Sequence, residues 1–485
     1  MSTAQPVKIR NEFIIVECEL DRSVIYTDLF MIVPPISKET GEVEATSLSV
    51  LIVGLDSVSR AHMHRSMPRT VGLLREMGMI DLNRHNRLGS HTFPNLVGLL
   101  NGNTVEELES TCWPSSDTPF DDCHFLWDEC SRYGYLTAFG EDMPSWGTFV
   151  YTRPGFVKQP TDYYLMPAFV AARDTSGRDL GTCFGSRRQF DVLLDYAVDL
   201  KLSLQKQKLF GLFWSSSSTH EWLGKTYWMD EIVFRFLTRI RDHLNDTVLV
   251  LMSDHGLRIG EYREHTLAGR IEVDLPFTFL VFPEWYRKLR PRAFQTLLRN
   301  SERLTTHFDT HETLKSLLPA GERIIPSTGP GKNLFTEELS PSRTCEEAGI
   351  IMDYCVTWTF TAIDDDESAR RFGSSVVRHM NPQMKEYPQC AELSLDRVSR
   401  LASMRPPSDE GAAWGHFQVA LSTLPGGGTF EAHVTVSSRS RDPSDASTDF
   451  LESELAVAGI TRVNKYGNQS HCVNEYELLE ICYCL

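Results

Sequence analysis

Apolar residues along the chain fall into short continuous runs that alternate with helical patterns. The clearest run covers 48–56 (LSVLIVGLD), where nearly every side chain is apolar. Such a run is typical of a strand buried on both faces of a parallel sheet. Similar runs lie at 135–139, 208–213, 247–252 and 276–283. Because strands and helices alternate, we expect an α/β fold with a mostly parallel central sheet covered by helices on both faces.

The segments between these runs have the apolar spacing of amphipathic helices. One predicted helix follows the stretch 66–70 and continues through Met77. A second begins directly after Thr92 and ends at Gly102. Further helices are predicted over 122–133, 186–203 and 228–243. A further helix is predicted over 309–318. Asp309 is its expected N-cap, and Glu312 three residues later would complete a capping box.

The pattern changes beyond residue 345. Segments 355–363 and 429–437 predict strands, and 392–403 predicts a helix. The stretch PPSDEGAAWG lies between the predicted strands, and the later polar run 437–449 predicts an exposed loop. We therefore expect two parts, a large α/β domain over 1–345 and a smaller α+β region over 346–485.

Charge and cysteine content narrow the class of protein. The 485 residues include 65 acidic and 48 basic side chains, and the net charge of −17 argues against a nucleic-acid binder. A bound divalent cation would still allow a phosphorylated substrate. The eleven cysteines contain no CxxC pair, which favours a disulfide framework over a metal knuckle. Two glycosylation sequons begin at Asn245 and Asn468, although such triplets also arise by chance.

Neither a membrane span nor a signal peptide is predicted, since no run of 18 apolar residues occurs and the first twenty residues lack the signal-peptide layout. The cysteines favour an oxidising compartment. We therefore expect a lumenal or extracellular protein, membrane-associated only through a segment outside this chain.

Polar residues with metal-binding chemistry follow three of the predicted strands. Asp56, His220 and the pair Asp254-His255 all fall at strand carboxyl ends, where open parallel sheets bind ligands. Carboxylate and imidazole together suit zinc or manganese, and Gly256 allows a sharp turn after the pair. The alternatives are a turn-forming aspartate, a hydrogen-bonded loop pair and a structural histidine.

Thr92 immediately precedes a predicted helix. It is either an N-cap or a nucleophile, because helix amides stabilise anions and a metal lowers the pKa of a hydroxyl group. His265 and His307 are further candidates for a second metal or for substrate binding, whereas His311 is expected to pack within a helix. Arg60 and His62 follow Asp56 and are either substrate-binding groups or ordinary surface residues.

Several stretches together resemble the alkaline phosphatase superfamily in its sulfatase-like branch, and most closely the domain of unknown function 229 family. They are LDSVSRAHMHRSMPRT, HTFPNLVGLLNG, FGEDMPSWG, TDYYL, LFWSSSSTHEWL, VLMSDHGLRIG, LTTHFDTHETLKS and SPSRTCEEAG. The resemblance implies that Asp56, Asp254 and His255 hold one divalent metal, with Thr92 as the nucleophile. It also implies that His220 contacts the transferred group or a second metal, and it places His265 near another functional histidine of phosphoethanolamine transferases and lipoteichoic acid synthases.

Two departures limit what the resemblance implies. Thr92-Phe93-Pro94-Asn95-Leu96 lacks both the residue that is converted to formylglycine and the arginine that sulfatases need, and the aspartate of a two-zinc site is missing near His220. We therefore expect a metal-dependent hydrolase or phosphotransferase that acts on a phosphoric mono- or diester of a small molecule, lipid or glycan. Zinc is the expected metal, with manganese or calcium as alternatives. The alternative functions are a sulfatase-like binding protein with little or no activity, and a sulfatase without formylglycine.

Overall fold

The structure is a computed structural model and describes most of the 485 residues. The described residues are 8–9, 11–36, 46–176, 183–204, 207–220, 222–319, 329–405, 415–436 and 455–485. They form two compact units, the first comprising 1–256 and 275–343 and the second comprising 257–274 and 344–485. The chain therefore leaves the first unit directly after Asp254-His255-Gly256 and returns to it at Leu275. The boundary at residue 345 remains a prediction.

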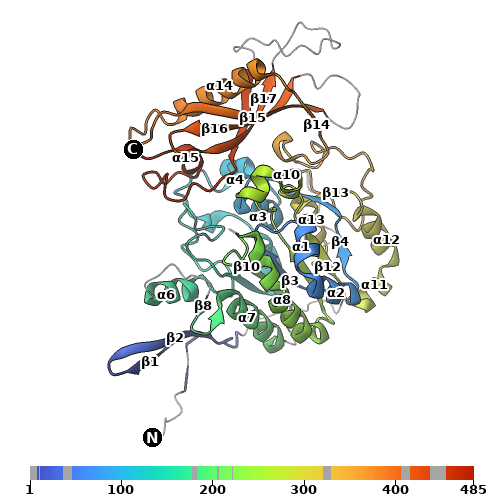
Figure 1. The fold of residues 1–485 in the computed structure, drawn as a ribbon. Coiled ribbons are helices and arrows are strands. Elements are labelled where there is room, and N and C mark those ends of the chain that lie inside the picture. The colour runs from blue at the N-terminus through green and yellow to red at the C-terminus, as the bar shows by residue number, and fades with distance from the viewer. Residues whose placement is uncertain are drawn as a thin grey trace. The chain divides into compact units, whose positions relative to one another are not determined.

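A seven-stranded sheet forms the centre of the first unit (Figure 1), in the order β4-β12-β11-β3-β10-β6-β7. Strands β11, β3, β10, β6 and β7 are parallel to one another, and β12 and β4 continue the sheet in antiparallel fashion. The strands are β3 Ser49–Leu55, β4 Ile80–Asp81, β6 Leu136–Glu141, β7 Tyr163–Tyr164, β10 Leu209–Ser215, β11 Thr247–Met252 and β12 Thr278–Val281. The expected α/β fold is confirmed.

Helices cover both faces of this sheet because the side chains of a strand alternate between two apolar cores. Leu51 and Val53 of β3 lie in one core and Val50 and Ile52 in the other. The first core is covered by α1 Arg60–Ser66, α2 Pro68–Glu76, α6 Met166–Ser176, α7 Gln189–Ser203 and α8 Thr226–Ile240. The second is covered by α3 Thr92–Leu100, α4 Val105–Thr111, α5 Leu126–Arg132, α11 Glu284–Leu289, α12 Pro291–Asn300 and α13 His307–Lys315.

Three small two-stranded sheets complete the first unit. A hairpin near the N-terminus pairs two strands that the apolar pattern did not predict, and each of the other two sheets pairs two strands of two or three residues. They are β1 Phe13–Leu20 with β2 Ser23–Met31, β5 Arg84–Asn86 with β13 Leu304–Thr306, and β8 Cys183–Phe184 with β9 Arg187–Arg188.

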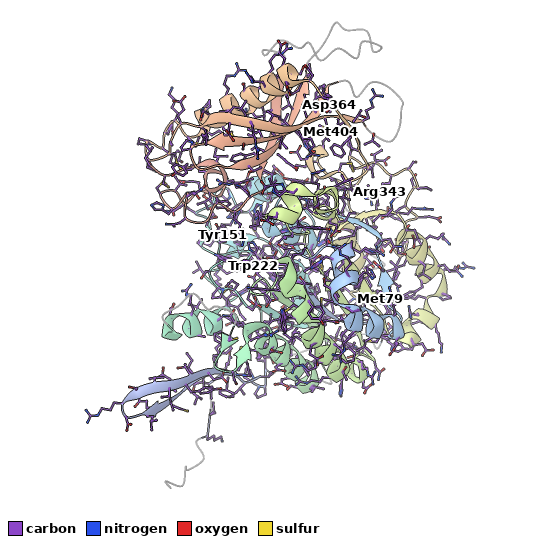
Figure 2. All side chains as sticks on the ribbon, viewed as in Figure 1. Met79, Tyr151, Trp222, Arg343, Asp364 and Met404 are labelled. Atoms are coloured by element: carbon purple, nitrogen blue, oxygen red, sulfur yellow. A yellow bond between two sulfur atoms is a disulfide. The ribbon has the colours of Figure 1, made fainter. Side chains whose placement is uncertain are left out.

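The second unit is a five-stranded antiparallel sheet with one long helix. The strand order is β14-β15-β16-β17-β18. Its strands are β14 Thr359–Ala362, β15 Ser394–Arg405, β16 His416–Leu424, β17 Thr429–Val436 and β18 Leu455–Arg462. Its helices are α9 Glu261–His265, α10 Leu267–Glu272, α14 Asp366–Gln383 and α15 Tyr476–Ile481. Met404, labelled in Figure 2, belongs to β15.

One predicted element is wrong, and one helix was missed. The predicted helix 392–403 is strand β15, and the long helix of this unit, α14, was not predicted. Helix α13 begins at His307, so Asp309 is its third residue and not its N-cap; Asp309 Oδ2 accepts a hydrogen bond from Thr306 N at 2.8 Å. The predicted loop 437–449 lies outside the described residues.

Four disulfides cross-link the described chain and confirm the expected framework. They are Cys112–Cys123, Cys345–Cys355, Cys390–Cys482 and Cys472–Cys484. The four disulfides do not include Cys18, Cys130 or Cys183. No helix in the described ranges has both the length and the apolar character needed to cross a membrane.

Candidate active site

Three neighbouring parallel strands deliver the candidate residues to one edge of the first unit's sheet. In the ladder of β11, β3 and β10, Met252 pairs with Gly54 and Trp214 also pairs with Gly54. Asp56 lies directly after β3, and Asp254 lies two residues after β11. Because these strand ends are adjacent, the two aspartates arrive side by side.

Asp56, Asp254 and His255 converge in the protein interior. Their exposed fractions are 2%, 0% and 0%. His255 Nε2 lies 3.2 Å from Asp254 Oδ2 and 4.0 Å from Asp56 Oδ1. Each residue offers one ligand atom, and these atoms lie within 4.8 Å of one another. The sequence prediction that these three residues lie together agrees with this geometry.

The turn after β3 holds both carboxylates in place. Ser57 Oγ donates to Asp56 Oδ1 at 2.7 Å, and Ser57 N donates to Asp254 Oδ1 at 3.1 Å. Ser57 adopts a φ of 62°, a left-handed conformation that costs a serine free energy and that proteins often retain at functional sites. Sequence reasoning did not identify Ser57, because its role depends on contacts across the sheet.

The orientation of His255 is fixed by its own turn. Nδ1 lies 2.8 Å from the carbonyl oxygen of Gly256, which can only accept a hydrogen bond. Nδ1 therefore carries the proton and Nε2 presents its lone pair toward the carboxylates, which is the tautomer of a metal-ligating histidine. Burial raises the pKa of Asp254 above its ordinary value, although hydrogen bonds from Thr92, Ser57 N and His255 N oppose this effect.

Thr92 is the first residue of α3, and its hydroxyl group faces the carboxylates. Thr92 Oγ1 donates to Asp56 Oδ2 at 3.4 Å. The N-cap of α3 is His91, so Thr92 does not cap the helix. Asn95 secures the turn before the helix, since its Oδ1 accepts from Leu88 N at 2.6 Å and its Nδ2 donates to His91 O at 2.7 Å.

His220 lies in the loop after β10 at the same edge of the sheet. Its ring is 5.4 Å from the ring of Trp146, and its Nδ1 atom is buried without a hydrogen-bond partner. Trp222, two residues further on and labelled in Figure 2, is 57% exposed. Asp142 organises the start of this loop, accepting hydrogen bonds from Ser216 N at 2.9 Å and from Ser217 N at 3.1 Å.

Strand β6 brings two acidic residues to this edge that sequence reasoning missed, Glu141 and Asp142. Glu141 Oε1 accepts from Thr148 N at 2.8 Å and from Thr148 Oγ1 at 2.6 Å, whereas Oε2 is buried without a partner. Burial raises the pKa of Glu141 to about 7, and the charges of Asp142 and Asp56 add to this shift. Both residues lie at the end of a strand, in the FGEDMPSWG stretch, and this position could have identified them as site residues from the sequence.

The remaining candidates make other contacts and do not belong to the group of Asp56, Asp254 and His255. Arg60 is held by Asp81 in a bidentate ion pair of 2.7–2.8 Å, and His62 Nε2 lies 2.9 Å from Leu223 O. His307 Nε2 lies 3.3 Å from Ser253 O, and burial lowers the pKa of His307 to about 4. His265 is exposed on α9, in the second unit.

His311 is buried within α13, as expected, with Nδ1 2.8 Å from Leu99 O.

A comparison with protein families matches residues 1–399 to the family described as "Protein of unknown function (DUF229)". The chain belongs to the DUF229 family. The family resemblance expected from the sequence is therefore confirmed. A search of the curated proteins finds none that matches this DUF229 chain.

Solved structures similar to this DUF229 chain include three from bacteria. The C-terminal periplasmic domain of EcEptC from Escherichia coli, in complex with Zn, is 13% identical; the match covers 59% of this chain and 86% of that one with a TM-score of 0.41. The lipoteichoic acid synthase LtaP from Listeria monocytogenes is 14% identical, with coverages of 62% and 80% and a TM-score of 0.41. The putative sulfatase yidJ from Bacteroides fragilis is 12% identical, with coverages of 79% and 88% and a TM-score of 0.42.

The residues present in this DUF229 chain fit a divalent metal. Two carboxylates buried together without a cation would repel each other and lose hydration, which is costly. Asp254 Oδ2 is buried without a hydrogen-bond partner, as expected of an oxygen that binds an ion. Two carboxylate oxygens, one imidazole nitrogen and a neighbouring hydroxyl group form a donor set that zinc and manganese accept.

Proposed function

We propose that this protein is a metal-dependent hydrolase or phosphotransferase that acts on a phosphoric mono- or diester through Thr92. The observation that carries the proposal is the position of the Thr92 hydroxyl group. It lies at the first turn of a helix and 3.4 Å from Asp56 Oδ2, beside the buried cluster of Asp56, Asp254 and His255. A structural threonine at a helix start would instead turn its oxygen toward the helix amides.

Asp56, Asp254 and His255 would hold the metal, and zinc agrees best with their mixture of oxygen and nitrogen donors. When bound, such an ion lowers the pKa of the Thr92 hydroxyl group and offsets the charge of the two carboxylates. Burial of the three side chains keeps water away from them, so their charge acts on the reacting group with little screening. Thr92 is the nucleophile of this arrangement.

In the reaction, the Thr92 oxygen forms a bond to phosphorus while the bond from phosphorus to the ester oxygen breaks. The proton of the hydroxyl group passes to Asp56 Oδ2, which already accepts a hydrogen bond from it, and the departing alcohol takes up a proton, for which His220 is the candidate donor. The first amides of α3 would bind non-bridging oxygens of the phosphoryl group, except at Pro94, which has no N–H. Water or a second alcohol then accepts the phosphoryl group from Thr92 and restores the hydroxyl group.

The proposed substrate is a phosphorylated small molecule, lipid or glycan. The four disulfides support a lumenal or extracellular site of action. Asn245 and Asn468 are both exposed, which supports glycosylation at the two sequons. The negative net charge supports the view that nucleic acids are not substrates.

The test is hydrolysis of aryl phosphate monoesters and diesters by purified protein supplied with zinc or manganese. We expect Thr92→Ala to lower turnover at least about a thousandfold, in line with the loss of a nucleophile. Thr104→Ala is the matched control, because Thr104 is the N-cap of α4 and the substitution costs about 1 kcal/mol of stability without touching the site. Full activity of Thr92→Ala would refute the proposal, whereas phosphate attached to Thr92 after substrate exposure would support it directly.

A further inference from the structure

Residues 257–274 belong to the second unit, although in the sequence they lie between two segments of the first. They bring two arginines close to a buried carboxylate. Helices α9 and α10 of this segment pack at unusually short range, since a Cβ atom on Gly269 would lie 2.2 Å from Tyr262 O and 2.9 Å from the Cα atom of Arg263. Only glycine permits this approach. The close packing places Arg270, the residue after Gly269, beside the helix that carries Arg263.

Glu431 of β17 joins two of three arginines in this cluster. Arg263 Nη2 donates to Glu431 Oε2 at 2.5 Å, and Arg400 Nη2 donates to Glu431 Oε1 at 2.8 Å. Arg400 and Glu431 lie in one row of the sheet, because both pair with Ala420 of β16. Each carboxylate oxygen of Glu431 is thus engaged by one guanidinium group. The charge of Arg270 also acts on Glu431, lowering its pKa together with Arg263 and Arg400.

Several buried charges meet around Glu431. Three arginines act on Glu431, and Asp274 is a second carboxylate whose charge acts on Arg263. A third carboxylate, Glu272 of α10, is also buried and accepts a hydrogen bond from Tyr262, while Arg263 is only 5% exposed. Buried charges in proteins are normally paired, because an unpaired ion in the interior loses its hydration without compensation.

Two arginine donors in the cluster have no acceptor. Arg263 Nη1 and Arg270 Nε are both buried and form no hydrogen bond. Unsatisfied buried donors are rare in native proteins and often mark a missing ion or water. A guanidinium group pairs best with the oxygens of a carboxylate, phosphate or sulfate, because its N–H groups match their spacing.

We propose that Arg263, Arg270 and Arg400 form a binding site for a phosphate or sulfate group in the second unit. The anion accepts hydrogen bonds from Arg263 Nη1 and Arg270 Nε, the two buried donors that otherwise have no acceptor. Glu431 is a positioning residue that holds Arg263 and Arg400 apart at a fixed separation. This site is independent of the proposed metal centre, and its ligand is either the free inorganic anion or the same group carried on a larger molecule.

The site is tested by thermal unfolding of the full chain in increasing inorganic phosphate or sulfate, at constant ionic strength balanced with chloride. We expect both anions to raise the melting temperature and chloride to leave it unchanged. Arg270→Gln keeps the Arg263–Glu431–Arg400 contacts and should weaken the apparent affinity at least about tenfold, the cost of one charge-assisted contact. Arg378→Gln, on the exposed face of α14, is the matched control and should bind as the wild type does.

A second variant separates this site from the proposed metal centre, where phosphate is also a product. Asp254→Asn removes a metal ligand and should keep the full anion response, whereas Arg270→Gln should keep metal-dependent ester hydrolysis. A sulfated or phosphorylated monosaccharide that binds more tightly than the inorganic anion would identify the larger molecule as the source of the group. No response of the wild type beyond that of chloride, or equal responses of Arg270→Gln and wild type, would overturn the proposal and leave a purely structural ion cluster.

Discussion

Glu141 makes the stability of the metal-free protein depend on pH in a calculable way. The carboxyl group is 3% exposed, and its pKa rises from the ordinary 4.5 to about 7 in the folded state. Below pH 4.5 the group is protonated in both the folded and the unfolded state, and above pH 7 it is ionised in both. Between these values the folded state alone retains the proton, so the free energy of unfolding falls as pH rises.

The size of this effect follows from the shift in pKa. A shift from 4.5 to about 7 corresponds to about 3 kcal/mol, at about 1.4 kcal/mol for each pH unit. Glu141→Gln removes the titrating group while the amide oxygen can still accept both hydrogen bonds from Thr148. The new amide N–H groups replace an oxygen that has no partner, and they add a penalty that does not vary with pH.

The assay is urea unfolding at pH values from 4.5 to 8 in the presence of a chelator, followed by tryptophan fluorescence. The difference in unfolding free energy between Glu141→Gln and the wild type should shift by about 3 kcal/mol in favour of the variant as pH rises. Glu109→Gln, on the exposed surface of α4, is the control and should show no such trend. A difference that stays constant across this range would mean that Glu141 is ionised in the folded protein throughout, and the reasoning from burial would be refuted.

Two further predictions concern the metal and the disulfides. Zinc at a hundred times its dissociation constant should stabilise the protein by about 2.7 kcal/mol, and Asp254→Asn should lose this gain; an equal rise in melting temperature for both proteins would contradict the metal site. The disulfide between Cys390 and Cys482 joins residues 92 positions apart, and replacing both by serine should lower the free energy of unfolding by about 4 to 5 kcal/mol. Cys472 and Cys484 are 12 positions apart, and replacing both should lower it by about 3 kcal/mol. Urea unfolding of the two double variants checks this order. Both partners of each disulfide are replaced because Cys472 Sγ lies 3.8 Å from Cys482 Sγ, so that a single remaining thiol could exchange with the neighbouring disulfide.

The failure over 392–403 shows how a strand can resemble a helix in sequence. Leu395, Val398 and Leu401 are three residues apart, a spacing that predicts one face of a helix. All three pack in the core of the second unit, but from a strand. The pairing of β15 with β16 shifts register between Leu395 and Arg397 and again between Val398 and Arg400, and each irregularity inserts a residue that changes the alternation from two to three.

Helix α14 was missed for a related reason. Gly373 and the serines beside it have low helix propensity and obscured an otherwise regular apolar face. In the structure Gly373 packs tightly against the sheet, since a Cβ atom there would lie 2.5 Å from Val398 Cγ2. A residue that weakens the isolated helix therefore allows the helix to pack, and sequence propensity cannot detect that gain.

By itself, the sequence determined the parallel sheet and the residues at its edge. Continuous apolar runs can be buried only between two layers of helices, and the polar residue that ends each run must lie where parallel strands end together. Asp56 and Asp254 were found for this reason. The tertiary structure alone decided that the hydroxyl group of Thr92 faces Asp56, that Ser57 and Glu141 belong to the same edge, and that Arg263 and Arg270 surround Glu431, because these relations depend on side-chain direction and on contacts between residues far apart in the chain.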